Sequence, residues 1–229
     1  MRKNYIIDAL LIIMALLGSF FIYNSNKNYI YKDYDSLDLS VKNLMIVAHP
    51  SDELLWGGAH LIEDDYIVVC ITCGLDEKKV EEFQSVIKET NDQLITLGYP
   101  DKVLGIKSNW HEEKEKITQD LKKILELNDW NIIVTHNKDG EYGNIQNKLT
   151  NRYVTEIYDE LNLNSNLYYF GEFYKESKYN ELEIKPEKIG DELLTQKIEI
   201  LKQYKSQNYI NETFNHMLPH ENWNFYEKK

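Results

Sequence analysis

The stretch that decides the fold is residues 44–53, which read LMIVAHPSDE. The five apolar residues at its start, 44–48, are typical of a short strand that is buried on both faces of a parallel sheet. The polar residues from His49 onward follow this strand directly and lead into a helical pattern that begins near Asp52. A strand, a polar turn and a helix in this order predict one unit of an α/β protein, with polar side chains at the carboxyl end of the strand.

The same alternation of strand and helix continues along the chain. Apolar runs predict further strands over residues 66–71, 103–106, 130–134 and 167–170. Apolar residues at steps of three and four predict helices over residues 52–62, 80–97, 112–127, 149–161 and 193–204, the second of which is expected to stop at Gly98. We therefore expect an α/β domain with a Rossmann-like parallel sheet and helices on both faces.

The charge of the chain excludes one large class of function. Its 229 residues include 26 basic and 38 acidic ones, a net charge of −12. Residues 1–23 hold two basic residues and one acidic one, so the remaining 206 carry 24 basic and 37 acidic residues, a net of −13. Only Arg2 and Arg152 are arginines. Nucleic-acid binding is excluded, because recognition of a phosphate backbone depends on clustered basic side chains.

An apolar stretch near the start predicts a membrane anchor. Residues 5–23 contain one charged side chain, Asp8, and would be about 28 Å long as a helix, close to the thickness of the hydrocarbon core. A cleaved signal peptide is disfavoured because bulky residues, 20–23, stand where a cleavage site would need small ones. We expect a single-pass membrane protein with the body outside the cytoplasm. Its parts are a tail (1–4), a transmembrane anchor (5–23), a tether (24–42) and a domain (43–229).

Three polar loops follow predicted strands and are the candidate functional segments: residues 49–53, 74–77 and 136–147. In the first, His49 and Asp52 stand three residues apart and could both turn toward one metal ion. This spacing alone is a weak signal for a metal site. The glycines Gly57 and Gly58 lack the spacing of a dinucleotide-binding loop.

The first loop in its setting resembles the Ala-His-Pro-Asp-Asp-Glu signature of the PIG-L/LmbE-like N-acetylglucosamine deacetylases. The likeness continues through the segments WGGAH, LGYPD, THNKDGEYG and YKSQ, at residues 56–60, 97–101, 135–143 and 204–207. It spans roughly residues 43–225. The resemblance implies a Rossmann-like fold and a zinc-bound water that hydrolyses the acetamide of an N-acetylated amino sugar or glycan.

The resemblance also implies a zinc site that is incomplete in this chain. His49 and Asp52 match two of the family's zinc ligands, whereas Asn147 falls on the histidine that is the third. An amide oxygen is a neutral donor that is poorly matched to zinc beside imidazole and carboxylate. Zinc is thus the cofactor that the family implies, and we expect its binding here to be weak or absent.

The catalytic positions implied by the resemblance are altered as well. Tyr142 matches a tyrosine that polarises the acetyl carbonyl. Ser51 stands where the family has its general-base aspartate, and Asn144 replaces a histidine that serves as an electrostatic or acid catalyst. A serine hydroxyl does not accept a proton near neutral pH, and losing a general base typically costs about 10²–10⁴-fold in rate.

Three neighbouring residues are candidates to compensate for these losses: Glu53, His136 and Glu141. Three hypotheses follow. The first is a membrane-anchored relative of the sugar deacetylases whose zinc chemistry is lost or badly weakened, and which persists as a glycan-binding or scaffold domain. The alternative is an active zinc-dependent amino-sugar deacetylase with a rearranged site. The third is an unrelated Rossmann-like binding domain.

Overall fold

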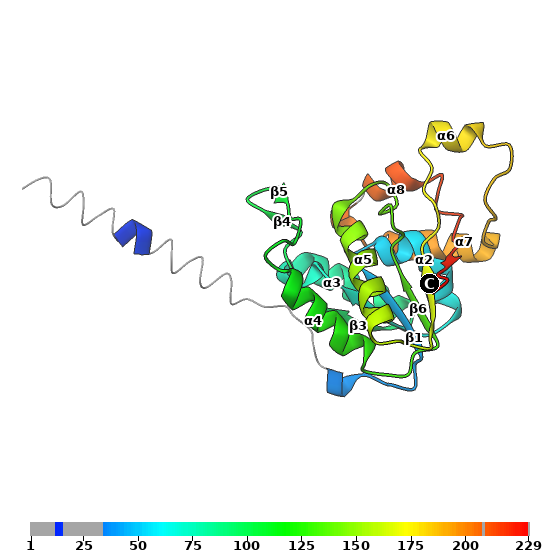
Figure 1. The fold of residues 1–229 in the computed structure, drawn as a ribbon. Helices are drawn as coiled ribbons and strands as arrows, with labels where there is room; N and C mark the ends of the chain where they lie inside the picture. Colours follow the sequence, from blue (N-terminus) through cyan, green and yellow to red (C-terminus); the bar gives the residue numbers. More distant parts are fainter. Residues whose placement is uncertain (1–11, 16–33, 208, 229) are drawn as a thin grey trace, which may run out of the picture.

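A six-stranded sheet forms the centre of the computed structural model, which describes residues 12–15, 34–207 and 209–228. The strand order is β3-β2-β1-β6-β7-β8 (Figure 1). The strands are β1 (Asn43–Val47), β2 (Tyr66–Cys70), β3 (Gln93–Thr96), β6 (Ile132–Thr135), β7 (Asn166–Tyr169) and β8 (Asn224–Phe225). Neighbouring strands from β3 to β7 run parallel, and β8 pairs antiparallel with β7. The predicted α/β fold with a mostly parallel sheet is confirmed, and the antiparallel edge strand is an addition to it.

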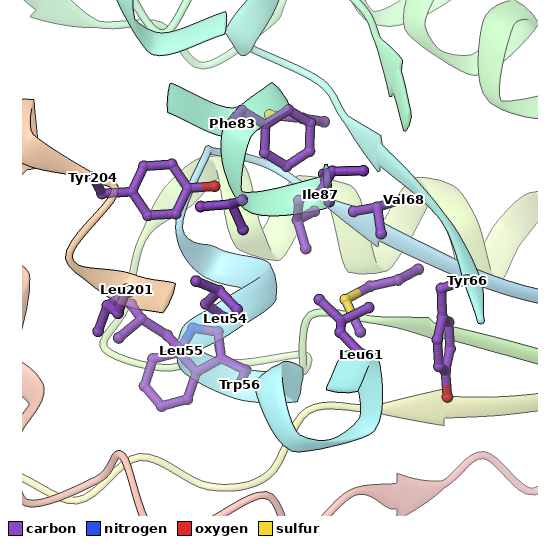
Figure 2. Packing of buried hydrophobic residues seen from close by; sticks show 14 of the residues in the cluster. Leu54, Leu55, Trp56, Leu61, Tyr66, Val68, Phe83, Ile87, Leu201 and Tyr204 are labelled. Atoms are coloured by element: carbon purple, nitrogen blue, oxygen red, sulfur yellow. The ribbon is translucent and has the colours of Figure 1, made fainter. Parts of the chain in front are cut away.

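Helices cover both faces of this sheet. The main ones are α2 (Asp52–Glu63), α3 (Glu77–Glu89), α4 (Lys114–Leu125), α5 (Ile145–Glu160) and α7 (Asp191–Leu201). Shorter elements are η1 (Tyr34–Ser36), η2 (Cys73–Leu75), α6 (Glu176–Glu181), η3 (Lys205–Gln207) and α8 (Tyr209–Phe214). Met45 and Val47 of β1 pack into a core with α2, α3 and α7, part of which Figure 2 shows. Leu44 and Ile46 point to the other face and pack with α4 and α5. This alternation follows from the two-residue period of a strand.

Two predicted elements were wrong in detail. The helix expected over residues 80–97 ends at Glu89 in α3, and a separate strand, β3, follows. The turn between them places Asn91 at φ 62°, which ends the helix, and Leu94 then pairs with Val68 of β2. The strand expected over 103–106 is instead a hairpin of β4 (Lys102–Val103) and β5 (Ile106–Lys107), which stands apart from the main sheet (Figure 1).

The described residues contradict the prediction of a single-pass membrane protein. In the part of the chain that the structure describes, no helix is both long and apolar enough to cross a bilayer. Of the expected anchor, residues 5–23, only 12–15 are described, and they are helical; the rest lie outside the described residues. Residues 34–42, which the sequence assigns to a tether, pack along the domain, where Asp38 N–H donates to Gln93 Oε1 at 2.6 Å.

Helix α2 is broken at Gly57, whose φ of −150° is not helical. The break leaves backbone groups without their helical partners, and side chains from the end of the chain replace them. Lys197 Nζ donates to Leu55 O at 2.9 Å, and the Glu221 carboxylate accepts from Ala59 N–H at 2.9 Å. The first half of α2, which begins at the candidate site, is thereby held against α7.

Candidate functional site

The candidate site lies at the carboxyl ends of β1 and β6, where the strand order reverses direction. Strands β2 and β3 lie on one side of β1, whereas β6 and β7 lie on the other. Ligand sites of open α/β sheets form at such a switch point. A cavity of about 380 Å³ opens here and is lined by the loop after β1, the loop after β6, the β4–β5 hairpin and the segment around α8.

A tight turn after β1 brings His49 and Asp52 together. Ser51 adopts φ 85°, a left-handed conformation that is uncommon for residues other than glycine, asparagine and aspartate, and α2 begins at the next residue. As a result, the Asp52 Oδ2 atom lies 3.0 Å from both the backbone nitrogen and the ring Nδ1 of His49. The predicted pair of His49 and Asp52 therefore meets in space, and Ser51 lines the cavity beside it.

The second ring nitrogen of His49 faces an amide oxygen. Gln146 Oε1 lies 2.7 Å from His49 Nε2, and the orientation of the Gln146 amide is fixed because its Nε2 donates to the carbonyls of Pro100 and Asp101 at 3.1 and 3.0 Å. Both ring nitrogens of His49 thus face oxygen atoms that accept hydrogen bonds. Burial opposes a charge on His49, but its interactions with Asp101 and Asp52 outweigh burial and raise the pKa of the imidazole to about 9.

Two carboxylates take part in this arrangement. Burial alone would raise the pKa of Asp52, but the hydrogen bond and charge of His49 hold it below its ordinary value. Asp101 lies 3.5 Å from His49 Nε2 and 3.3 Å from the Lys107 ammonium. These two partners overcome the effect of burial, so the pKa of Asp101 is also held well below its ordinary value.

His136 and Glu141 form a buried layer behind Asp52. His136 Nε2 accepts from the Ala48 N–H at 2.9 Å, and its Nδ1 lies 2.9 Å from Glu141 Oε2. The same His136 Nε2 lies 3.5 Å from Asp52 Oδ2. Neither His136 nor Glu141 lines the cavity, so each contacts the site through another residue rather than facing a bound molecule.

Glu53, the other candidate to compensate, turns away from the cavity. Its carboxyl accepts from the Tyr204 hydroxyl inside the hydrophobic core. Burial raises the pKa of Glu53 to about 8, because the charged form loses its hydration and the Tyr204 hydrogen bond restores only part of it. The side chain is fully buried, so it does not reach the position of a substitute base.

The remaining predicted residues are divided between the cavity and the interior. Tyr142 is 43% exposed and lines the cavity with its ring beside Phe214, at 5.1 Å between centroids. Asn144 caps α5, since its side chain accepts from the Gln146 N–H at 2.9 Å, and its Nδ2 donates to the Tyr142 hydroxyl at 3.3 Å. Asn147 is fully buried and donates to Glu141 Oε2 at 2.7 Å, while its Oδ1 has no hydrogen-bond partner in the described part of the chain.

The residues at this site do not fit zinc. Of the three ligand positions that the resemblance implies, only His49 and Asp52 are strong zinc ligands, and they are hydrogen-bonded to each other. The Nε2 of His49 is directed at Gln146, and Asn147 offers an amide oxygen in place of an imidazole. Among residues 12–15, 34–207 and 209–228, no group of three or more His, Cys, Asp or Glu side chains is arranged to hold a metal ion.

Several site residues were not found from the sequence. Gln146 lies between the two positions compared with the family histidines, and nothing in its spacing marks it. Asp101 stands in the LGYPD segment that carries the resemblance, which was the available signal. The three lysines of the cavity come from α3 and from the β4–β5 hairpin and have no motif: Lys79, Lys102 and Lys107.

Comparison with known proteins identifies the fold. No family model matches the sequence. An uncharacterised protein, L374, of Acanthamoeba polyphaga mimivirus is 29% identical over 180 residues, which cover 71% of this chain and 75% of that protein. No function follows from that likeness.

Solved structures are similar across most of the chain. A triple mutant of a deacetylase of the teicoplanin biosynthetic pathway has a TM-score of 0.60 at 16% identity, covering 78% of this chain and 88% of its own. The A40926 pseudoaglycone deacetylase Dbv21 has a TM-score of 0.58 at 12% identity, covering 76% and 85%. The 4-carboxy-2-hydroxymuconate hydratase GalB of Pseudomonas putida has a TM-score of 0.53 at 11% identity, covering 77% and 84%. Because deacetylases and a hydratase share this architecture, the likeness identifies the fold and not the reaction. The chain has a deacetylase-like α/β fold.

Proposed function

We propose that this protein binds an N-acetylated amino sugar or glycan in the cavity at the end of β1, and that its capacity for zinc-dependent deacetylation is lost or badly impaired. The observation that carries the proposal is the position of His49 between Asp52 Oδ2, at 3.0 Å, and Gln146 Oε1, at 2.7 Å. A histidine in this setting has no free lone pair to offer a metal ion. The carboxylate beside it is engaged as well.

Retention of the cavity supports a binding role. Its size of about 380 Å³ and its aromatic wall of Tyr142 and Phe214 suit one face of a sugar ring. Ser51 and Asn144 add short polar side chains at the same surface. Among the similar structures, one is a deacetylase in complex with teicoplanin and another is a deacetylase in complex with a compound abbreviated bog. Those ligands belong to the neighbours, and they support a ligand-binding role for a protein of this fold.

Impaired catalysis is supported by the chemistry of three side chains. A serine at position 51 is a poor general base, and its hydroxyl would leave a nucleophilic water without a proton acceptor. The carboxamide oxygen of Asn144 caps the N-terminus of α5, and its amide N–H is not acidic enough to transfer a proton to a leaving amine. Asn147 is directed at Glu141. These losses act on the same step, so their effects are not expected to add.

The test separates binding from hydrolysis. The full-length protein is titrated with the N-acetylglucosamine disaccharide, its zinc content is measured after purification in zinc-containing buffer, and acetate release is assayed. We expect saturable binding, clearly substoichiometric zinc and no acetate above the no-protein control. Near-stoichiometric zinc together with acetate release would overturn the loss of catalysis, and absence of binding to any N-acetylated sugar would overturn the binding role.

A gain-of-function variant tests the assignment of positions. Ser51→Asp, Asn144→His and Asn147→His are combined in one protein, with Asn109→His and Asn131→His as a matched pair outside the cavity. We expect the triple variant, and not the control, to take up zinc. If the folded triple variant does not bind more zinc than the parent and does not release acetate, the correspondence of these positions with the deacetylase family is wrong.

An active deacetylase with a rearranged site is the alternative. One observation favours it: the buried Asn147 Oδ1 has no hydrogen-bond partner in the described residues. A buried polar atom of this kind is costly unless something binds to it. The zinc and acetate measurements above distinguish this alternative from the main proposal.

A further inference from the structure

The charge of the cavity is opposite to that of the chain. The protein has a net charge of −12, yet three lysines line the cavity: Lys79, Lys102 and Lys107. Apart from the paired His49 and Asp52, the other charged residue of the lining is Asp101. One carboxylate therefore faces three ammonium groups.

The fold concentrates these lysines from two segments. Lys102 and Lys107 are cross-strand partners in the β4–β5 hairpin, so both side chains project from the same face of it. Lys79 comes from the first turn of α3. Lys107 Nζ lies 3.3 Å and Lys79 Nζ lies 4.0 Å from the Asp101 carboxylate. Within the described residues Lys102 makes no ion pair, so the neutralisation of Asp101 accounts for one positive charge and leaves two in excess.

An unpaired buried donor lies in the same lining. Gln207 is 8% exposed, and its amide Nε2 is buried without a hydrogen-bond partner in the described part of the chain. Leaving such a donor unpaired costs free energy, so its position in a cavity wall indicates a missing acceptor. Neither Gln207 nor the three lysines is needed to explain the hydrolytic positions discussed above.

From this juxtaposition we propose that the cavity holds an acid group of its ligand, a carboxylate or a phosphate, against Lys102, Lys107 and Lys79, with Gln207 donating to another oxygen of the same ligand. This deepens the proposed function and rests on it: the ligand class is an N-acetylated amino sugar that carries a negative charge. Lys102 and Lys107 are exposed at the wall of the cavity, so salt screens part of their charge, but three like charges that converge on one cavity still give it a positive potential. The cavity therefore attracts an anion even though the rest of the protein repels it.

The test compares neutral and anionic sugars on the full-length protein. N-acetylglucosamine, N-acetylglucosamine 6-phosphate and N-acetylmuramic acid are titrated by calorimetry at low and at high salt, and the last two separate phosphate from carboxylate. We expect one or both anionic sugars to bind about tenfold more tightly than the neutral one at low salt, with the advantage lost at high salt. Lys102→Gln should weaken binding of the anionic sugar about three- to tenfold and leave the neutral sugar unchanged.

The control is Lys116→Gln, which removes one exposed lysine of α4 outside the cavity and changes net charge by the same amount. Equal affinity for neutral and anionic sugars, or equal effects of the two lysine variants, would overturn the proposal of an acid group. Inorganic phosphate is titrated in parallel, with NMR shifts followed at the amides of residues 101–107. If no sugar binds but phosphate shifts these amides in a Lys102-dependent manner, the sugar assignment fails and the anion site stands. If neither sugars nor phosphate shift them, the anion site is wrong.

Discussion

The imidazole ring of His49 is hydrogen-bonded to the side-chain amide of Gln146, with 2.7 Å between His49 Nε2 and Gln146 Oε1. The two residues come from the turn after β1 and from the first turn of α5, and the Gln146 amide also donates to the carbonyls of Pro100 and Asp101. One buried carboxamide therefore ties together three segments of the site. It also occupies the imidazole nitrogen that Asp52 leaves free.

This relationship predicts the cost of removing the amide. Gln146→Ala removes the acceptor of the His49 Nε2–H and leaves a cavity at a fully buried position, so we expect the free energy of unfolding to fall by about 2–3 kcal/mol. The carbonyls of Pro100 and Asp101 keep other donors, the Trp110 indole N–H and the Ser108 N–H. The measurement is urea denaturation followed by circular dichroism. Gln119→Ala is the control, since Gln119 is an exposed residue of α4 whose side chain makes a 3.4 Å hydrogen bond to Glu115, and it should change stability by less than about 0.5 kcal/mol. Similar losses in both variants would show that Gln146 does not hold the site together.

A second prediction concerns the aromatic wall. Tyr142→Ala should weaken binding of the N-acetylglucosamine disaccharide about five- to tenfold, because the exposed ring supplies the stacking surface. Tyr142→Phe should stay within about twofold, since it keeps the ring that supplies the stacking surface and removes a hydroxyl that accepts a 3.3 Å hydrogen bond from Asn144. Phe225→Ala removes another exposed aromatic ring, on β8 and outside the cavity, and should have no effect. Equal binding by Tyr142→Ala and Phe225→Ala would remove Tyr142 from the ligand surface.

Strands β1, β2, β6 and β7 and the first loop could be predicted from the sequence because they depend on local patterns. The apolar run before His49 is expected to be buried at any position in a parallel sheet, and the polar turn after it must lie at the carboxyl end of the strand. Asp52 then meets His49 three residues away. The boundary between α3 and β3 could not be predicted, because Leu94 continues the helical spacing although the left-handed Asn91 has already ended the helix.

The contacts that the sequence could not predict join residues far apart along the chain. Gln146 reaches His49 across 97 positions, and Lys197 reaches the broken turn of α2 at Leu55 across 142. No periodicity marks either residue, since each depends on where the helices dock. The negative charge of Glu53 suits the first turn of a helix, but its hydrogen bond to Tyr204 depends on how distant segments pack in the core, which the local sequence does not show.

Asp92 predicts how stability depends on pH. Its Oδ1 accepts from the Tyr66 N–H at 2.7 Å, its Oδ2 has no partner in the described residues, and burial raises its pKa to about 7. A carboxyl whose folded pKa is raised favours the folded state when protonated, so its contribution is present below the unfolded pKa near 4 and is lost as pH rises through about 7. Asp92→Asn keeps the acceptor and cannot ionise. The melting temperature of the variant should exceed that of the parent by a few degrees at pH 8 and by little at pH 5. A gap that is equal at both pH values would contradict the raised pKa.

The tip of the β4–β5 hairpin predicts a local change in stability. Leu104 and Gly105 form its two-residue turn with φ of 51° and 82°, and Leu104 is 90% exposed. Asparagine tolerates the left-handed conformation better than leucine, so Leu104→Asn should stabilise the hairpin by about 0.5–1 kcal/mol. The amide of Ser108, which donates to Asp101 O at 2.9 Å at the base of the hairpin, should then exchange with solvent about two- to fivefold more slowly. Leu104→Ala removes the apolar side chain but keeps the strain, so slower exchange in that variant would refute the explanation.

Lys197 and Glu221 predict strong coupling between two buried charges. Lys197 Nζ lies 2.6 Å from Glu221 Oε1, and both side chains are almost fully buried. Lys197→Met strands a carboxylate whose remaining donors are backbone N–H groups of Ala59 and His60, so we expect a loss of about 3–5 kcal/mol in the free energy of unfolding. Glu221→Gln should cost less, because Lys197 retains the carbonyls of Leu55 and Leu218 as acceptors. In the double variant no charge is left buried, so its loss should be smaller than the sum of the two single losses by at least about 1 kcal/mol in a double-mutant cycle. Additive losses would mean that the two side chains stabilise the break in α2 independently, through their backbone contacts, rather than as a pair.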